Sequence, residues 1–280
     1  RMVSNRLAVR LERYAVEHAA GFVSVSPVYL TELRERYGTR PALSPDRAVA
    51  IPFAGSHHDF PQHPTTRTFT SGATRRIVYI GAGGAIMRRS VDTICSAMAK
   101  VRREAPDLLQ GLQVLLAGTD SGWQDGGPRP LQDVAASYGL GDIVREEPRR
   151  ITYTDAMRLV QDSDGLLVLG VDDAGYVPSK LFTYALTGLP LLASLRDDSP
   201  ACAPFAQADG PGELLRFGPV SRPSGEADTM TMRRFLEAVQ QGQRRSPDRG
   251  ALQPFMAPAM ARRHARLFDT VLGQNSEGSL

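Results

Sequence analysis

The sequence has little of what would place it outside the cytoplasm. Its two cysteines, Cys95 and Cys202, give neither a disulfide framework nor a metal-binding spacing, which favours a reducing compartment. No apolar run reaches the roughly 18 residues of a membrane-spanning helix. Residues 1–13 are charged and amphipathic, unlike the apolar core of a signal peptide. We therefore expect a cytoplasmic location, with the inner face of the membrane as an alternative.

Lysine is also scarce, because the chain has only Lys100 and Lys180 and otherwise uses arginine. This bias is typical of a GC-rich, bacterial genome. The formal net charge of +3 permits peripheral contact with an anionic membrane or with phosphates but does not require it. The basic residues are scattered and do not alternate with aromatic ones, so we expect no nucleic-acid partner.

Motifs that would assign a reaction directly are missing as well. The chain has no G-K-[ST], which excludes a P-loop, and no G-x-S-x-G, H-E-x-x-H or S-x-x-K motif. His57, His58 and Asp59 stand together, but adjacent residues rarely bind one ion and no third ligand has a suitable spacing. We therefore expect no metal site.

The composition does support a substantial folded core. Hydrophobic residues make up 42% of the 280 positions, enough for one large or two modest domains. From residue 75 onward, short apolar runs alternate with helical patterns. Runs of this kind indicate parallel strands with helices on both faces of the sheet. We predict a doubly wound, Rossmann-like α/β domain over residues 75–253.

Residues 1–62 predict a smaller and incomplete unit. The pattern is a helix, a strand and a second helix, with Ser26 and Pro27 at the start of the second helix and Gly38 at its end. This piece cannot close a core by itself, because a parallel strand needs neighbours on both sides. We interpret it as the end of an N-terminal domain. Residues 63–74, which are polar and rich in threonine, are predicted to form a linker.

The first strand of the large domain leads into a glycine-rich loop. Gly83 and Gly84 would let a ligand approach the backbone, and Arg88 and Arg89 could clamp phosphate oxygens. A dinucleotide fingerprint would need glycine where Ile86 stands, which disfavours a nicotinamide cofactor. The alternative is a solvent-exposed helix start without a ligand.

A second loop, residues 172–180, follows another apolar strand. Pro178 and Ser179 predict the start of a helix there, and Gly188 is expected to end it in a left-handed conformation. Unpaired N–H groups at the helix start, with Lys180 beside them, would form an anion site. An ordinary helix–strand unit without a ligand is the alternative.

Two acids open this second loop. Asp172 and Asp173 are candidate catalytic residues, because a carboxylate at a strand end could act as a general base or accept hydroxyl groups. They could equally be solvated loop acids. The sequence places no acidic partner opposite them.

Segments along most of the chain resemble glycosyltransferases with the GT-B fold, and most of all the retaining, family 4-like enzymes. P-S-K-L-F-T-Y-A-L-T-G-L-P-L-L-A, residues 178–193, is similar to their P-S-K-L-[FY]-E-Y-[ML]-A-x-G-x-P-[VI]-[LI]-A segment. V-A-I-P-F-A-G-S-H-H-D-F resembles their interdomain connection, and R-I-V-Y-I-G-A-G-G their first donor-binding loop. The final helix, within residues 254–280, resembles one that packs back towards the N-terminal part.

The resemblance implies a hexose transfer from a nucleotide-diphosphate sugar to an unknown saccharide, lipid-linked or small-molecule acceptor, without metal or further cofactor. It assigns the donor diphosphate to Gly83, Gly84, Arg88, Arg89, Ser179 and Lys180. It assigns the base and ribose to Arg149, Ile151 and Thr183, and the sugar to Asp173, Ala174, Gly175, Tyr176 and Val177.

The sequence departs from this family at one binding position. Relatives carry glutamate where Thr183 stands, and that glutamate accepts the ribose hydroxyls, whereas threonine is neutral and shorter. Only the end of an acceptor domain is matched by residues 1–62. The alternative function is therefore a catalytically inactive, glycosyltransferase-like nucleotide-binding or scaffold protein.

Overall fold

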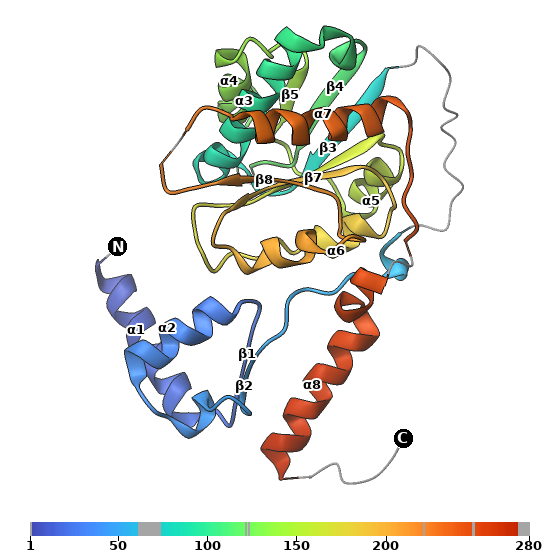
Figure 1. The fold of residues 1–280 in the computed structure, drawn as a ribbon. Coiled ribbons are helices and arrows are strands. Elements are labelled where there is room, and N and C mark those ends of the chain that lie inside the picture. Colours follow the sequence, from blue (N-terminus) through green and yellow to red (C-terminus); the bar gives the residue numbers. More distant parts are fainter. Residues whose placement is uncertain are drawn as a thin grey trace. The chain divides into compact units, whose positions relative to one another are not determined.

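The structure, a computed structural model, describes residues 2–60, 74–120, 122, 124–220, 222–247 and 250–273. The chain forms two compact units, one comprising Arg1–Ala54 with Pro254–Leu280 and the other Gly55–Gln253. Their elements are labelled in Figure 1. The predicted linker, residues 63–74, lies outside the described residues except for Thr74.

The smaller unit contains a two-stranded parallel sheet and three α-helices among its described residues. The elements are α1 (Met2–His18), β1 (Phe22–Ser24), α2 (Pro27–Tyr37), β2 (Ala48–Ala50) and α8 (Ala257–Leu272). The predicted cap is confirmed, because the Ser26 side chain accepts a hydrogen bond from the Val28 N–H. Gly38 follows the last residue of α2, as predicted.

The apolar face expected on α1 is not buried in this unit. Leu7, Leu11 and Tyr14 are 57%, 59% and 62% exposed, whereas Val16 is buried. A sheet of only two strands has little apolar surface, so it cannot bury the apolar side chains of the helices that pack against it. The core of the smaller unit is accordingly small, and its buried residues are Val16, Leu30, Leu43 and Ala48.

The larger unit is built on a fully parallel sheet, as predicted. Its strands are β3 (Arg75–Ile80), β4 (Leu112–Ala117), β5 (Val144–Glu147), β6 (Gly165–Leu169), β7 (Leu191–Arg196) and β8 (Glu213–Phe217). Their order is β5-β4-β3-β6-β7-β8. Every residue of β6 is buried, which explains why its sequence is continuously apolar.

Helices cover both faces of this sheet (Figure 1). They are α3 (Arg88–Glu104), α4 (Pro130–Ser137), α5 (Tyr153–Gln161), α6 (Leu181–Ala185) and α7 (Glu226–Gln240). Helices α3, α4 and α7 pack together on one face, and α5 and α6 lie on the other. Buried side chains such as Met98 and Phe235 fill the first interface. The doubly wound α/β fold is confirmed.

The structure gives the starts of three helices in the larger unit. Thr152 caps α5, and its hydroxyl accepts from the Asp155 N–H. Arg88 and Arg89 are the first residues of α3. Helix α6 begins later than predicted, because Pro178 and Ser179 belong to a turn closed by the bond from Leu181 N to Pro178 O (3.3 Å). The helix is therefore only five residues long.

The direction of winding reverses between β3 and β6. The chain runs from β3 to β4 and β5 on one side, and from β6 to β7 and β8 on the other. Open α/β sheets bind ligands beyond the carboxyl ends of the strands at such a switch point. The loops that follow β3 and β6 meet there, and they are the two loops that the sequence singles out.

Candidate functional site

The loop after β3 is shaped by contacts with its own strand and with the loop after β4. The Tyr79 hydroxyl donates to Ala82 O at 2.5 Å, and Gly83 N donates to Thr119 O at 2.8 Å. A Cβ on Gly83 would lie 2.5 Å from Thr119 Cβ, so a side chain does not fit there. Around Gly84, by contrast, a Cβ would meet no atom within 4 Å. Of the two glycines assigned to phosphate, Gly84 is the one open to a ligand.

Lys180 brings the two loops together. A Cβ on Gly81 would lie 3.0 Å from Lys180 Nζ, and Gly81 has a φ of 151°, which favours glycine. The Lys180 side chain is half-buried, and burial together with the nearby Arg150 guanidinium lowers the pKa of its ammonium group. Within the described part of the chain, no carboxylate pairs with Lys180 or Arg150. Two neighbouring cations without a counter-charge favour binding of an anion.

Tyrosines surround the inner side of this position. Tyr79, Tyr176 and Tyr184 line a small cavity of about 20 Å³ with Lys180 at the ends of β3 and β6. Burial raises the pKa of all three phenols, so they stay uncharged at neutral pH. Neutral hydroxyls leave the positive charge of Lys180 uncompensated.

The structure distinguishes the two arginines assigned to the diphosphate. Arg89 Nε lies 3.2 Å from Asp172 Oδ2, and Arg89 Nη1 donates to Gly218 O at 3.0 Å. Arg88 is exposed and has no partner among the residues that the structure describes. Arg88 is therefore available to a ligand, whereas Arg89 joins α3 to the loops after β6 and β8.

The candidate catalytic acids have different environments. Asp172 contacts both Arg89 and Arg196 at 3.2 Å, so its carboxylate is held in ion pairs between three segments. Asp173 Oδ1 accepts the Gly175 N–H at 2.7 Å and shapes the turn. Both acids are exposed.

The rest of the loop offers mostly backbone to a ligand. Val177 and Gly175 are buried, and Ala174 is partly exposed. The Tyr176 carbonyl accepts the Ser199 hydroxyl at 2.9 Å, which fixes the loop onto the segment after β7. Of the residues assigned to the sugar, Asp173 presents the most accessible polar side chain.

The residues assigned to the base lie in the loop after β5. Arg149 Nη2 lies 2.6 Å from Asp125 Oδ1 on the surface, and Ile151 is 38% exposed. Arg150, between them, is the residue that approaches Lys180. Sequence reasoning missed Arg150, although its place after a strand of the parallel sheet is a signal that could have identified it.

A carboxylate that sequence reasoning did not assign lies beside Thr183. Thr183 is buried, and its hydroxyl donates to Asp59 Oδ2 at 3.3 Å. Burial and the neighbouring Asp59 carboxylate raise the pKa of Tyr153. Asp59 is the last residue of the H-H-D motif, residues 57–59. Among the described residues, no group of three or more His, Cys, Asp or Glu side chains could hold a metal ion.

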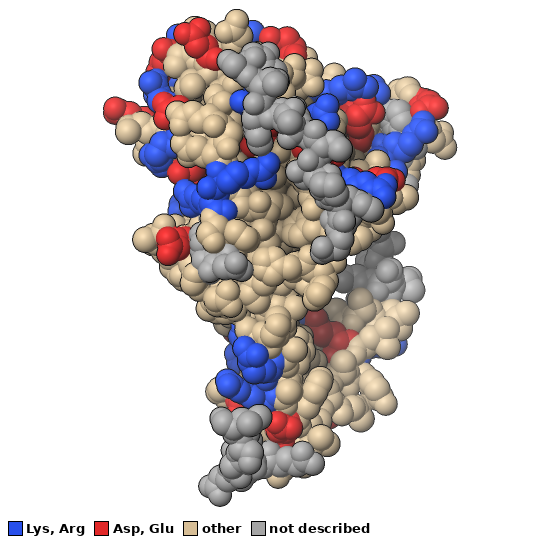
Figure 2. Space-filling view, turned by 90° about the vertical axis from the view of Figure 1, so that its right-hand side faces the viewer, with Lys and Arg blue, Asp and Glu red and all other residues tan. Residues whose placement is uncertain are grey.

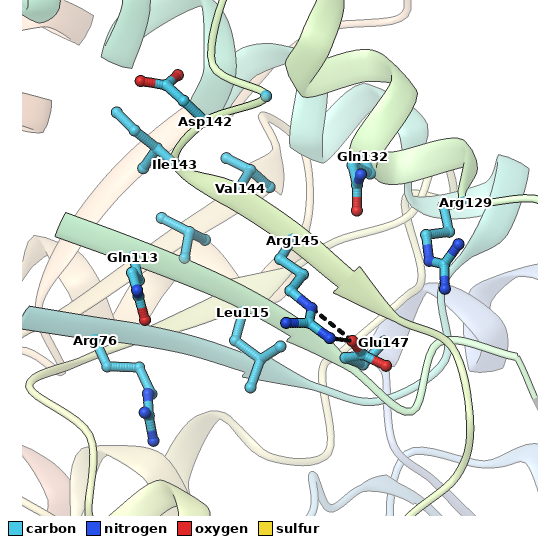
Figure 3. A pocket seen from close by; sticks show the side chains of 12 residues that line it. Arg76, Gln113, Leu115, Arg129, Gln132, Asp142, Ile143, Val144, Arg145 and Glu147 are labelled. Carbon is cyan, nitrogen blue, oxygen red and sulfur yellow. Dashed lines mark hydrogen bonds and ion pairs between the residues drawn. The ribbon is translucent and has the colours of Figure 1, made fainter.

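A much larger hollow than the one beside Lys180 lies over β3, β4 and β5 (Figure 3). It has a volume of about 690 Å³, and none of the residues assigned above lines it. Figure 3 shows that Arg145 and Glu147 pair with each other within it. Arg129 Nε is likewise bound, to Glu146 O at 3.1 Å. Volume alone therefore does not mark the site, and we place it at the switch point, where unpaired cations converge.

The surface and the helices add two observations. Figure 2 shows Lys and Arg side chains in several separate groups on the face in view, most of them with Asp or Glu nearby. Of the described helices, none is both long and apolar enough to cross a membrane.

Comparison with solved structures identifies the fold. The chain superposes on the Anabaena protein HepE in complex with UDP and glucose with a TM-score of 0.61 and 14% identity, over 95% of this chain and 66% of that one. The sucrose-phosphate synthase of Thermosynechococcus elongatus gives 0.53 and 16%, over 96% and 63%. AviGT4, a glycosyltransferase involved in avilamycin A biosynthesis, gives 0.52 and 12%, over 90% and 64%.

These likenesses show the GT-B glycosyltransferase fold. The chain spans about two thirds of the length of these structures. No family model matches the sequence, and no curated protein matches it.

Proposed function

We propose that this chain is the donor-binding part of a glycosyltransferase, which moves a hexose from a nucleotide-diphosphate sugar to an acceptor hydroxyl. The observation that carries the proposal is that Lys180, with Arg150 nearby, lies at the switch point of a GT-B fold without a counter-charge in the described structure. Solved structures of similar fold, described as HepE complexes, hold UDP or UDP-glucose. A diphosphate is the anion that this arrangement fits best.

The chemistry would use these cations directly. When the bond between the sugar C1 and the diphosphate oxygen breaks, negative charge develops on the leaving diphosphate. Fixed positive groups aimed at that charge lower the barrier. Lys180, Arg150 and Arg88 would supply them, and Gly84 would let the phosphates approach the backbone. We propose a metal-independent reaction with retention at C1, in which Asp173 faces the sugar.

The acceptor and the setting belong to the same proposal. The smaller unit, residues 1–54 with 254–280, would contribute to the acceptor side. We propose that the acceptor is a saccharide, a lipid-linked molecule or a small molecule. The scarcity of cysteine and lysine and the small positive net charge fit a bacterial cytoplasm, at or near the inner membrane surface. No further cofactor is required for a transfer of this kind.

A second function is a nucleotide-binding or scaffold protein without catalysis. Two observations favour it: Thr183 replaces the expected acid, and Asp172 is bound in ion pairs with Arg89 and Arg196. Both functions include nucleotide binding, so product formation separates them.

Thermal unfolding with added nucleotides tests the proposal. Ribonucleoside diphosphates are expected to raise the melting temperature of the chain in the presence of EDTA, whereas NAD is not, because ligands that bind only the folded state stabilise it. Melting curves with UDP, GDP, ADP and NAD at equal concentrations give the measurement. No shift with any nucleoside diphosphate contradicts donor binding. Transfer or hydrolysis of the corresponding sugar nucleotide then distinguishes the enzyme from the binding protein.

Arg88 and Arg89 should respond differently to replacement by alanine. Arg88→Ala is expected to weaken nucleoside diphosphate binding about tenfold, the effect of one lost hydrogen bond to a charged group, without a change in melting temperature. Arg89→Ala should instead destabilise the fold by about 1 kcal/mol, because it loses a partly exposed ion pair and a bond to Gly218 O. Titration calorimetry and thermal melts measure the two effects. The reverse pattern would assign the diphosphate to Arg89.

A further inference from the structure

We propose that Asp59 supplies the carboxylate that accepts the ribose hydroxyls of the bound nucleotide, in the place where Thr183 cannot. This assignment rests on the proposed donor binding. It concerns a residue outside the two loops of the switch point, in the segment that enters the larger unit.

The first step of the argument is the path of that segment. A Cβ on Gly55 would lie 2.9 Å from the carbonyl carbon of Phe182, so the chain at Gly55 packs directly on the backbone of α6. Ser56 then caps the short turn His57–Asp59, and its side chain accepts the His58 N–H. The segment from Gly55 to Asp59 therefore follows α6, with Asp59 next to Thr183.

The second step is the state of the Asp59 carboxylate. It accepts the Thr183 hydroxyl at 3.3 Å and lies beside the Tyr153 hydroxyl. In the described part of the chain no Lys or Arg side chain pairs with it. A carboxylate has about four acceptor positions, and two hydroxyl neighbours occupy only part of them. Asp59 is half-buried, so the remaining acceptor positions stay accessible to a ligand.

The third step is where this carboxylate lies relative to the cations. Thr183 follows Lys180 by three residues, a spacing that puts side chains on the same side of a helical turn. Arg150 lies near Lys180, and Thr183 and Tyr153 both approach Asp59. The carboxylate beside Thr183 is thus about one helical turn from the cation at Lys180.

A nucleoside diphosphate has the same polarity. Its phosphates need positive groups, and the ribose 2′- and 3′-hydroxyls, a few ångströms away, need an acceptor. A carboxylate can accept both hydroxyls of such a diol. Inorganic pyrophosphate has the phosphates but no ribose diol, so it would form no hydrogen bond with Asp59. The ligand class is therefore a ribonucleotide rather than a simple phosphate.

The test compares ligands with and without the diol. The ribonucleoside diphosphate that stabilises the wild-type chain most, its 2′,3′-dideoxy analogue and pyrophosphate are titrated into wild type and Asp59→Asn. Asp59→Asn is expected to bind the ribonucleotide about tenfold more weakly, as for one lost hydrogen bond to a charged group, and the other two ligands unchanged. Asp142→Asn, a surface acid paired with Arg102, is the matched control and should change none of the affinities.

A second variant distinguishes the loss of the carboxylate from a change in the local structure. Adding Thr183→Glu to Asp59→Asn returns a carboxylate to the neighbouring position and is expected to restore the preference for the ribonucleotide over its dideoxy analogue. Equal losses for both nucleotides in Asp59→Asn, or no loss, would overturn the assignment while leaving donor binding intact. A wild-type chain that binds no nucleoside diphosphate would overturn the proposed function and the assignment with it.

Discussion

Replacement of Lys180 by alanine is expected to weaken nucleoside diphosphate binding about a hundredfold, the largest loss we predict for a side chain of the site. Lys180 touches the glycine loop after β3 from the loop after β6, so its ammonium group lies where both loops meet. It is half-buried and has no carboxylate partner in the described structure. A charge in that position interacts with a diphosphate through a medium less polar than water, which strengthens the contact.

The chain provides its own control for this variant. Lys100 is the only other lysine, and it lies on α3, away from the ends of the strands. Lys100→Ala should bind the nucleotide like the wild type, because Lys100 lies outside the site. It also removes one positive charge, as Lys180→Ala does, so the comparison corrects for the change in net charge. Titration calorimetry at constant ionic strength compares the three proteins. Equal affinities for Lys180→Ala and Lys100→Ala would remove Lys180 from the diphosphate site.

The pH dependence of nucleotide affinity is a second test of the role of Lys180. Burial, and to a smaller extent Arg150, lowers the pKa of Lys180, so the ammonium group loses its proton at lower pH than an ordinary lysine. Only the protonated form attracts the diphosphate. Affinity should therefore decline as the pH rises through this lowered pKa, and the decline should be absent in Lys180→Ala. A decline that persists in the variant must arise from another group.

Much of the fold can be predicted from the sequence because it depends on local patterns. The continuous apolar run of β6 is buried along its whole length, and a strand of this kind needs neighbours on both faces. Ser26 and Gly38 mark the ends of α2 through backbone chemistry that involves few residues. The resemblance of segments along the chain to glycosyltransferases implies the GT-B fold, and the comparison with solved structures confirms it.

The candidate site is harder to predict, because its residues acquire their roles through distant contacts. Arg88 and Arg89 are equivalent in the sequence, and only the ion pair with Asp172 distinguishes them. Asp59 precedes Thr183 by more than a hundred residues, so no spacing rule connects them. The start of α6 was predicted too early because Pro and Ser suit a turn as well as a helix start.

Gly188→Ala is expected to destabilise the larger unit by about 3 kcal/mol, which combines a left-handed backbone, a steric clash and a weakened hydrogen bond. Gly188 has a φ of 70°, and a Cβ there would lie 2.2 Å from Arg245 O. Arg245 N also donates to Gly188 O at 2.7 Å, so the two backbones cannot separate without losing that bond. Urea unfolding, followed by circular dichroism, measures the free energy of unfolding.

Gly139→Ala isolates the steric part of this effect. Gly139 has nearly the same φ, 72°, but no atom lies within 4 Å of a Cβ built there. It should therefore cost only the backbone contribution of about 1 kcal/mol. Equal losses of unfolding free energy in the two variants would mean that the backbone at Arg245 moves away from the new Cβ at no energetic cost. Because Gly188 ends the segment that carries Lys180 and Thr183, its replacement should also weaken nucleotide binding, whereas Gly139→Ala should not. Stability and binding would then depend on the same short stretch of backbone after β6.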